Sequence, residues 1–362
     1  MLKLSFAVLI LFLLFAVTPP GNAQDAPALA QDTSRARIYI DPAERRKAGV
    51  PRQLTDWLSV SGLLEAGSDY NDFRTYEVFL SAQAGFDLTF SDMITAELLV
   101  GYDNFDRYNF DGLYLDVAAI NLEGESWSVS AGRQYLPFGA FYSHFVTAPI
   151  VDLFETRATS ANLEYSLDYL EENTFELWAS VFAGEARSIG IGGDSLDFGF
   201  GFEFSSDDET LTLGVGYLSD LAETIGLFEA SFGDLSQERV PGLSAYARAG
   251  LDDFEITVEM AKAIGTVSEF GADLDKPWAW NVEVAYFPWP SMMVAARIEA
   301  SEELFDEPER QYGLTATWRI REHVTLAADY LFGTFKRDFA FDNNGEELRS
   351  RNWIAAQISI EL

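Results

Sequence analysis

Short segments that alternate apolar and polar residues recur along the chain, and this pattern limits the folds available to it. Residues 198–204 read FGFGFEF, so a strand over them carries phenylalanine on one face and glycine or glutamate on the other. The same period of two occurs at residues 126–131, 280–286 and 354–362. Because each apolar face must meet a core or a lipid, the pattern predicts an all-β protein.

The alternation predicts about sixteen strands, an even number as closure of an outer-membrane barrel requires. They are expected at residues 57–65, 75–90, 93–103, 112–122, 126–135, 158–167, 173–183, 195–205, 210–218, 241–250, 254–263, 278–287, 291–300, 310–319, 323–333 and 350–362. The connections alternate in length. Short turns, most of them rich in Asp, Ser, Gly or Pro, are expected at 91–92, 123–125, 168–172, 206–209, 251–253, 288–290 and 320–322.

This alternation of turn lengths favours a transmembrane antiparallel β-barrel, with short periplasmic turns and long extracellular loops. Both chain ends are then expected in the periplasm. A soluble β-sandwich is the alternative, but its apolar face would be mostly aliphatic and its turns would lack the length asymmetry. Beyond the N-terminus, no apolar stretch approaches the roughly 20 residues of a spanning helix.

The composition fits a barrel in which an apolar outer face and a polar inner face give a mean hydropathy near zero. The chain has 362 residues, a net charge of −34 and a mean hydropathy of −0.01. Such acidity argues against a nucleic-acid partner. The absence of cysteine excludes disulfides and thiolate metal sites.

The N-terminus reads as an export signal followed by an irregular segment. Residues 1–23 are predicted to be a signal peptide, because Lys3 precedes the apolar run Leu4–Val17 and small residues lead to Ala23. An anchor helix is the alternative, and the shortness of the run disfavours it. Residues 24–56 are expected to be a periplasmic or lumen-facing segment, either a disordered linker or a basic segment that partly occupies an acidic pore. Residues 57–362 form the predicted barrel.

Export without a spanning helix predicts the outer membrane of a Gram-negative cell, with outer-membrane lipid and lipopolysaccharide as partners. Aromatic residues near the ends of the expected strands fit interfacial girdles. They are Trp57, Tyr102, Trp127, Tyr217, Trp278, Tyr286, Trp289, Tyr312, Trp318 and Trp353.

Strand parity assigns most charges to the barrel interior, because a charge facing acyl chains costs about 2–4 kcal/mol at mid-depth. The candidate pore-lining residues are Glu97, Asp116, Glu176, Glu203, Glu259, Glu283, Arg248 and Arg297. Further acids of the same parity are Glu77, Asp87, Glu164, Glu255, Glu299 and Asp329. Excess carboxylate predicts a water-filled channel with weak to moderate cation selectivity. Alternatively, the basic N-terminal segment or divalent ions cancel this field.

The connection at residues 136–156 is the third long loop, the position at which porin-like barrels narrow. Its candidate constriction residues are Asp152, Glu155 and Arg157. Arg133 shares the parity of Trp127, which points it at lipid unless Gly132 forms a bulge or the strand has left the membrane.

Two segments resemble a known family. Residues 132–150, GRQYLPFGAFYSHFVTAPI, continue to Glu155-Thr156-Arg157, and residues 216–224 read GYLSDLAET. Both are similar to features of the LbtU family of siderophore porins. The resemblance implies an outer-membrane barrel that takes part in the uptake of iron–siderophore complexes.

The predicted function is therefore an outer-membrane channel for small hydrophilic solutes such as iron–siderophore complexes. A general cation-preferring diffusion porin and a plugged structural barrel are the alternatives. No enzyme, cofactor or metal site is expected, because His144 and His323 have no identifiable catalytic partners. The sequence leaves the oligomeric state open, a homo-oligomer included.

Overall fold

The computed structural model describes residues 51–362 except 72–73, 105–111, 170–172, 185–195, 207–209, 222–223, 225, 228–238, 267–275, 305, 338 and 342–346. The expected signal peptide and most of the segment 24–56 lie outside the described residues. Among the described residues, no helix combines the length and the apolar character needed to cross a membrane.

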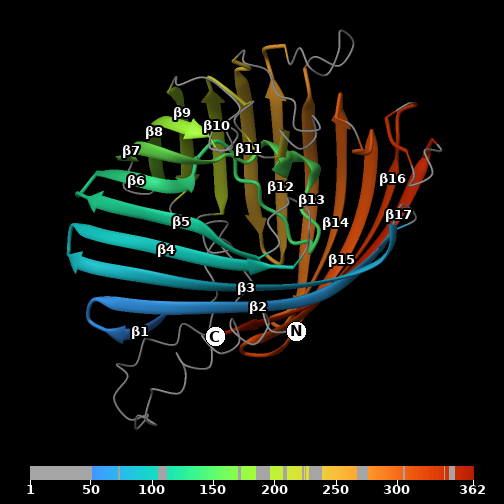
Figure 1. The fold of residues 1–362 in the computed structure, drawn as a ribbon, viewed down its shortest axis with the longest axis horizontal. Helices are drawn as coiled ribbons and strands as arrows, with labels where there is room; N and C mark the ends of the chain where they lie inside the picture. Colours follow the sequence, from blue (N-terminus) through green and yellow to red (C-terminus); the bar gives the residue numbers. More distant parts are fainter. Residues whose placement is uncertain are drawn as a thin grey trace. The chain divides into compact units, whose positions relative to one another are not determined.

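Sixteen antiparallel strands close into a barrel, as the alternation predicts (Figure 1). They are β2 (Leu58–Asn71), β3 (Arg74–Ser91), β4 (Ile94–Asp103), β5 (Gly112–Glu123), β6 (Trp127–Tyr135), β7 (Arg157–Tyr169), β8 (Asn173–Gly184), β9 (Asp197–Ser206), β10 (Leu211–Leu218), β11 (Gly242–Leu251), β12 (Phe254–Ala263), β13 (Trp278–Trp289), β14 (Met292–Glu302), β15 (Arg310–Arg321), β16 (Val324–Thr334) and β17 (Ser350–Glu361). Each strand pairs with the next in chain order, and β17 pairs with β2 to close the ring.

The first hairpin is longer than the sequence suggests. The connection expected at residues 66–74 is largely strand, because β2 continues to Asn71 and pairs there with Arg74 at the start of β3. Alternation between inward Gly67 and outward Ser68 continues the ladder through this region. A short additional strand, β1 (Arg52–Thr55), pairs with the start of β2 in a part of the chain expected to be irregular.

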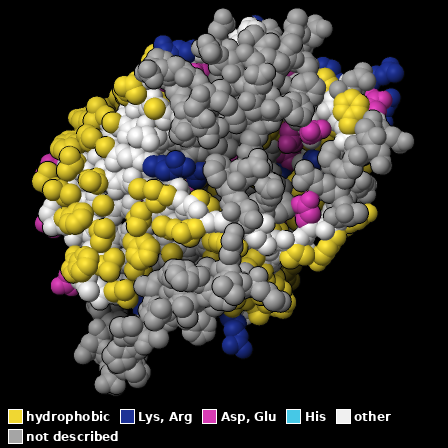
Figure 2. All heavy atoms as spheres, viewed as in Figure 1, with side chains coloured by type: hydrophobic (Ala, Val, Ile, Leu, Met, Phe, Trp, Pro, Cys, Tyr) yellow, Lys and Arg dark blue, Asp and Glu magenta, His cyan; other side chains and the backbone are white. Residues whose placement is uncertain are grey.

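Side chains divide between an apolar outer face and a polar inner face. Leu163, Phe200 and Leu314 point outward and are 51%, 53% and 62% exposed. Glu259 and Glu283 point inward. Figure 2 shows hydrophobic side chains gathered on the outer wall at the left of the view. The barrel therefore presents its apolar residues to the surroundings, as a lipid-embedded barrel must.

A bulge in β5 preserves this division. Leu99 pairs with Val117 whereas Val100 pairs with Leu115, so Asp116 is the extra residue. Because of the bulge, Asp116 and Val117 are both buried.

The expected aromatic girdle is outward-facing except at one position. Trp57, Trp127, Trp289 and Trp318 are exposed beside the short turns. The sequence places Trp353 among them, but it alternates with outward Ile354 and packs against the buried interior cluster that includes Leu331 and Phe145. Its girdle assignment is therefore wrong.

A charge placed on the outer face tests this orientation. We expect Leu314→Arg to lower the free energy of unfolding by about 2–4 kcal/mol, since arginine would face acyl chains. Urea titration of the barrel refolded in liposomes measures the change. The control is Gln83→Arg on the inner face of β3, where we expect a smaller loss. Equal losses would contradict the assigned orientation.

Candidate functional site: a loop folded into the barrel

The connection between β6 and β7 lies inside the barrel, as the sequence predicts for the third long loop. The chain leaves β6 at Tyr135, forms the short 3-10 helix η1 (Ile150–Phe154) and returns at Arg157. Here η1 packs against β12, β13 and β14. We call residues 136–156 the inner loop.

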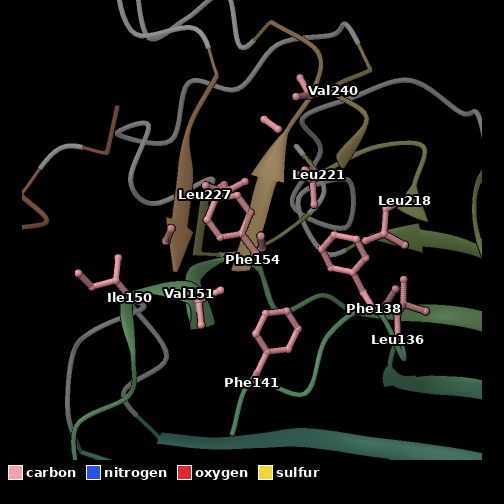
Figure 3. Packing of buried hydrophobic residues seen from close by; sticks show 14 of the residues in the cluster. Leu136, Phe138, Phe141, Ile150, Val151, Phe154, Leu218, Leu221, Leu227 and Val240 are labelled. Atoms are coloured by element: carbon pink, nitrogen blue, oxygen red, sulfur yellow. The ribbon is translucent and has the colours of Figure 1, made fainter. Parts of the chain in front are cut away.

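Apolar side chains of the inner loop form a core within the barrel (Figure 3). The buried loop residues are Leu136, Phe138, Phe141, Ile150, Val151 and Phe154. They pack against Trp178 and Phe182 of β8 and Leu218 of β10. Burying such large side chains favours the inward position by removing apolar surface from water.

The barrel wall leaves room for this loop at a glycine. A Cβ added to Gly216 of β10 would lie 2.5 Å from the carbonyl oxygen of Phe138. The loop backbone can approach β10 this closely only because no side chain intervenes.

Residues of a second connection, between β10 and β11, pack against the inner loop. Leu221, Leu227 and Val240 belong to the same apolar core. The Thr224 hydroxyl donates a hydrogen bond of 3.4 Å to the carbonyl oxygen of Leu153 in η1. The two connections therefore pack as one unit over the described residues.

Carboxylates of the inner wall accept hydrogen bonds from the backbone of the inner loop. Glu259 Oε1 of β12 accepts from the backbone N–H groups of Ala140 at 2.7 Å and Phe141 at 3.0 Å. Phe141 has a φ of 46°, a conformation that is uncommon for a non-glycine residue. The hydrogen bond to Glu259 helps to hold this unfavourable backbone in place.

The next two strands, β13 and β14, contribute acids in the same way. Glu283 of β13 accepts from the Ser143 hydroxyl at 2.6 Å and from the His144 N–H at 2.7 Å. The Ile150 N–H donates to Glu299 Oε2 of β14 at 2.7 Å. Hydrogen bonds to ionised carboxylates are stronger than neutral ones and stabilise a loop that lacks regular backbone pairing.

Asp329 of β16 fixes Thr147 near the far end of this network. Its Oδ2 accepts from the Thr147 N–H at 2.8 Å and from the Thr147 hydroxyl at 2.9 Å. The inner loop is thereby attached to four strands, β12, β13, β14 and β16.

Arg297 lies between the wall and the inner loop and is 1% exposed. Its Nη1 donates to Ser143 Oγ at 2.9 Å and to the Thr147 carbonyl at 3.0 Å. Its Nε lies 3.0 Å from Glu299 Oε1, and its guanidinium carbon lies 4.3 Å from the centroid of the Phe145 ring. Such a buried cation offsets part of the cost of burying several carboxylates.

His144 joins the inner loop to a second charged group. Its Nε2 lies 3.0 Å from Glu255 Oε1 and 3.0 Å from the Tyr142 hydroxyl. Arg248 lies 3.3 Å from Glu255 and 4.7 Å above the Tyr142 ring. These interactions account for His144 as a structural residue of the loop.

A cavity of about 250 Å³ separates the inner loop from the opposite wall. Val146 and Thr147 form its loop side. Its wall side consists of Glu65, Asp69, Phe79, Ser81, Asp103, Trp353, Ala355 and Gln357 from β2, β3, β4 and β17. We call this the loop–wall cavity, and it carries three carboxylates.

Some of the expected pore-lining residues lie on the inner wall outside the loop core. Glu176 and Glu203 face each other across β8 and β9. Glu97 of β4 also lies on this face and is half-buried. Asp116 is paired with Arg157 and accepts a hydrogen bond of 2.9 Å from the Tyr135 hydroxyl.

Other expected pore-lining residues are interior but covered. Glu259, Glu283 and Arg297 are at most 1% exposed because the inner loop lies over them. They hold the loop and do not line open space. Arg248 is paired with Glu255 beside the loop.

The expected constriction residues do not line the loop–wall cavity. Asp152 and Glu155 are half-buried in and after η1, and Arg157 begins β7 beside Asp116. Val146 and Thr147 form the loop side of the cavity, and sequence reasoning missed them. No charge or motif distinguishes these two residues from their neighbours.

Sequence reasoning also missed the three cavity acids. The pattern predicts that the first strand ends at residue 65, which leaves Asp69 in a loop. Glu65 and Asp103 lie at or near ends of expected strands, where the parity rule is least certain.

Arg133 shows no register shift. It pairs with Ala118 and Thr159, while Gly132 pairs with Ala119 and has a φ of 143°. A Cβ at Gly132 would lie 2.1 Å from the Ala118 carbonyl oxygen, so only glycine fits this backbone conformation with its positive φ.

Among the described residues, no group of three or more histidine, aspartate or glutamate side chains is arranged to hold a metal ion.

Comparison with known sequences gives only distant relatives. No family model matches the chain. A UPF0422 protein of Coxiella burnetii is 25% identical over 260 residues, which cover 67% of this chain and 56% of that protein. A UPF0422 protein of Legionella pneumophila strain Lens is 22% identical over 263 residues, covering 64% and 48%. The chain spans about half the length of these curated relatives. The resemblance to the LbtU family is therefore not confirmed.

Comparison with solved structures shows the fold. Salmonella typhi OmpF in complex with daunomycin has a TM-score of 0.61 at 11% identity, covering 86% of this chain and 100% of that chain. A mutant Rhodopseudomonas blastica porin has a TM-score of 0.53 at 14% identity, covering 84% and 100%. A loop-deletion mutant of Vibrio cholerae OmpT has a TM-score of 0.52 at 13% identity, covering 87% and 100%. The barrel therefore has the porin fold.

Removing one carboxylate charge tests how the inner loop is held. In Glu283→Gln, a single amide oxygen replaces two charged acceptors, so we expect a loss of about 1.5–3 kcal/mol in loop anchoring. Chymotrypsin should then cleave the inner loop at its Phe and Tyr residues at least about 10-fold faster. Mass spectrometry locates the cuts, and heat-modifiable migration on gels verifies the folded barrel.

Glu97→Gln is the matched control, since Glu97 is an inner-face acid of β4, which pairs with β3 and β5 and not with the strands that carry the loop's carboxylate acceptors. We expect its cleavage rate to equal that of the unmodified protein. Unchanged cleavage in Glu283→Gln would show that apolar packing alone holds the loop.

Proposed function

We propose that this protein is an outer-membrane channel for small hydrophilic solutes and that it prefers cations. The observation that carries the proposal is the closed sixteen-stranded barrel with an apolar exterior, an interior rich in carboxylates and a loop folded inside. A barrel of this strand number has room for an aqueous path beside its side chains. Residence in the outer membrane, among lipid and lipopolysaccharide, belongs to the proposal, and residues 1–23 would serve as its export signal.

Charge on the inner wall supports the preference for cations. Glu65, Asp69 and Asp103 line the loop–wall cavity. Three cations of the interior lie beside acids elsewhere on the wall: Arg157 with Asp116, Arg248 with Glu255, and Arg297 with Glu299. Fixed negative charge in a narrow channel lowers the energy of cations relative to anions.

Iron–siderophore uptake is a finer proposal that rests on the sequence resemblance alone. An acidic cavity does not favour an anionic ferric chelate, so we do not make this substrate part of the proposed function. A plugged structural barrel is the competing function, because the inner loop fills part of the interior.

Single-channel recording in a planar bilayer under a KCl gradient tests the channel. For the refolded protein, we expect discrete steps and a reversal potential displaced in the direction of K⁺ selectivity. A variant in which a short Gly/Ser linker replaces residues 138–154 should show larger steps, since the inner loop narrows the path.

The outcomes separate the two functions. If the intact protein is silent and only the loop-deleted variant conducts, the inner loop is a plug and the channel proposal fails. An anion-selective reversal potential would overturn the charge argument while leaving the channel in place.

A further inference from the structure

The loop–wall cavity has two sides of different chemistry. On the loop side, the polar atoms of Thr147 are already used: its N–H and hydroxyl donate to Asp329, and its carbonyl accepts from Arg297. What Val146 and Thr147 offer to the cavity is therefore mainly methyl groups. Because Asp329 and Arg297 fix Thr147, this apolar side is held in position.

The wall side carries charge in a fixed arrangement. The Ser81 and Ser359 hydroxyls donate to Glu65 at 3.1 and 3.2 Å, and the Gln357 amide also donates to it. These donors orient the carboxylate without being cations themselves. Asp69 and Asp103 add two further acids to the lining of the cavity.

Aromatic rings complete the wall. Phe79 and Trp353 line the cavity beside the acids. The ring of Trp353 already accepts a cation, because the Arg351 guanidinium lies 4.9 Å from its centroid. Arg351 also lies 5.3 Å from the Phe335 ring and is not itself a lining residue. Beside the acids, the rings of Phe79 and Trp353 therefore offer aromatic surface against which an apolar group can pack.

From these features we infer that the loop–wall cavity binds organic cations that carry an aromatic or aliphatic group, such as arylalkyl amines. The ammonium would lie toward Asp69 and Asp103, and the apolar group would lie between Trp353, Phe79 and the methyl groups of the loop. A volume of about 250 Å³ suits one small molecule of this kind. The inference rests on the proposed function, since it names a solute class for the same path.

Block of single-channel current by 2-phenylethylammonium tests the inference. We expect concentration-dependent interruptions that ethylammonium and 2-phenylethanol produce at least 10-fold less well, because each lacks one half of the recognised chemistry. The Asp69→Asn/Asp103→Asn double variant should weaken the block at least 10-fold. Trp353→Leu should weaken it about 3-fold or more, because it removes the ring against which the apolar group packs.

The matched control is Asp87→Asn, an acid on the inner face of β3 closer to the short turns. We expect 2-phenylethylammonium to block this variant at the same concentrations as it blocks the unmodified protein. The inference would be overturned if 2-phenylethylammonium blocked the double variant and the control equally. It would also be overturned if ethylammonium blocked as well as 2-phenylethylammonium. In both cases the channel proposal would stand.

If the protein does not conduct, equilibrium dialysis of 2-phenylethylammonium against the refolded barrel replaces the recording. Binding that the double variant loses and Asp87→Asn keeps would support the cavity even though the channel proposal had failed. Absence of binding, or binding unchanged in the double variant, would overturn it.

Discussion

Hydrogen bonds from the backbone of the inner loop to carboxylates of the barrel wall are the constraint on which the interior depends. Glu259, Glu283, Glu299 and Asp329 come from four strands and accept from successive parts of one loop. A loop without regular pairing must satisfy its N–H groups elsewhere, and here the carboxyl groups of the wall are the acceptors. The buried guanidinium of Arg297 makes this concentration of acids tolerable.

The same attachment divides the interior into two parts. On the side of β8 and β10, Trp178, Phe182 and Leu218 pack with the inner loop and form a solid apolar core. On the side of β2, β3, β4 and β17, the loop stops short of the wall and leaves an acidic cavity. In the proposed channel, solutes would therefore follow the second side, along the acids that the loop leaves uncovered.

Much of the barrel could be predicted from sequence, because the alternation of lipid-facing apolar and lumen-facing polar residues is a local signal that recurs along every strand. The strand order and the interior placement of Glu259 and Glu283 follow from it, whereas the inward loop follows from its place as the third long loop of a porin-like barrel. Which acids the loop covers could not be predicted, since coverage depends on contacts between residues more than a hundred positions apart. Asp69 was missed for a simpler reason: Gly67 and Ser68 obscured the alternation that extends β2. The Val146–Thr147 side of the cavity carries no sequence signal, because its role comes from being held by Asp329.

These long-range contacts also set an order for assembly. The inner loop lies between β6 and β7, but its hydrogen-bond acceptors belong to β12, β13, β14 and β16. Contacts of high sequence separation form late, because the intervening chain must first be positioned. The interior is consequently shaped only after the C-terminal strands have joined the sheet, and a barrel arrested before that stage would have a wall but no constriction.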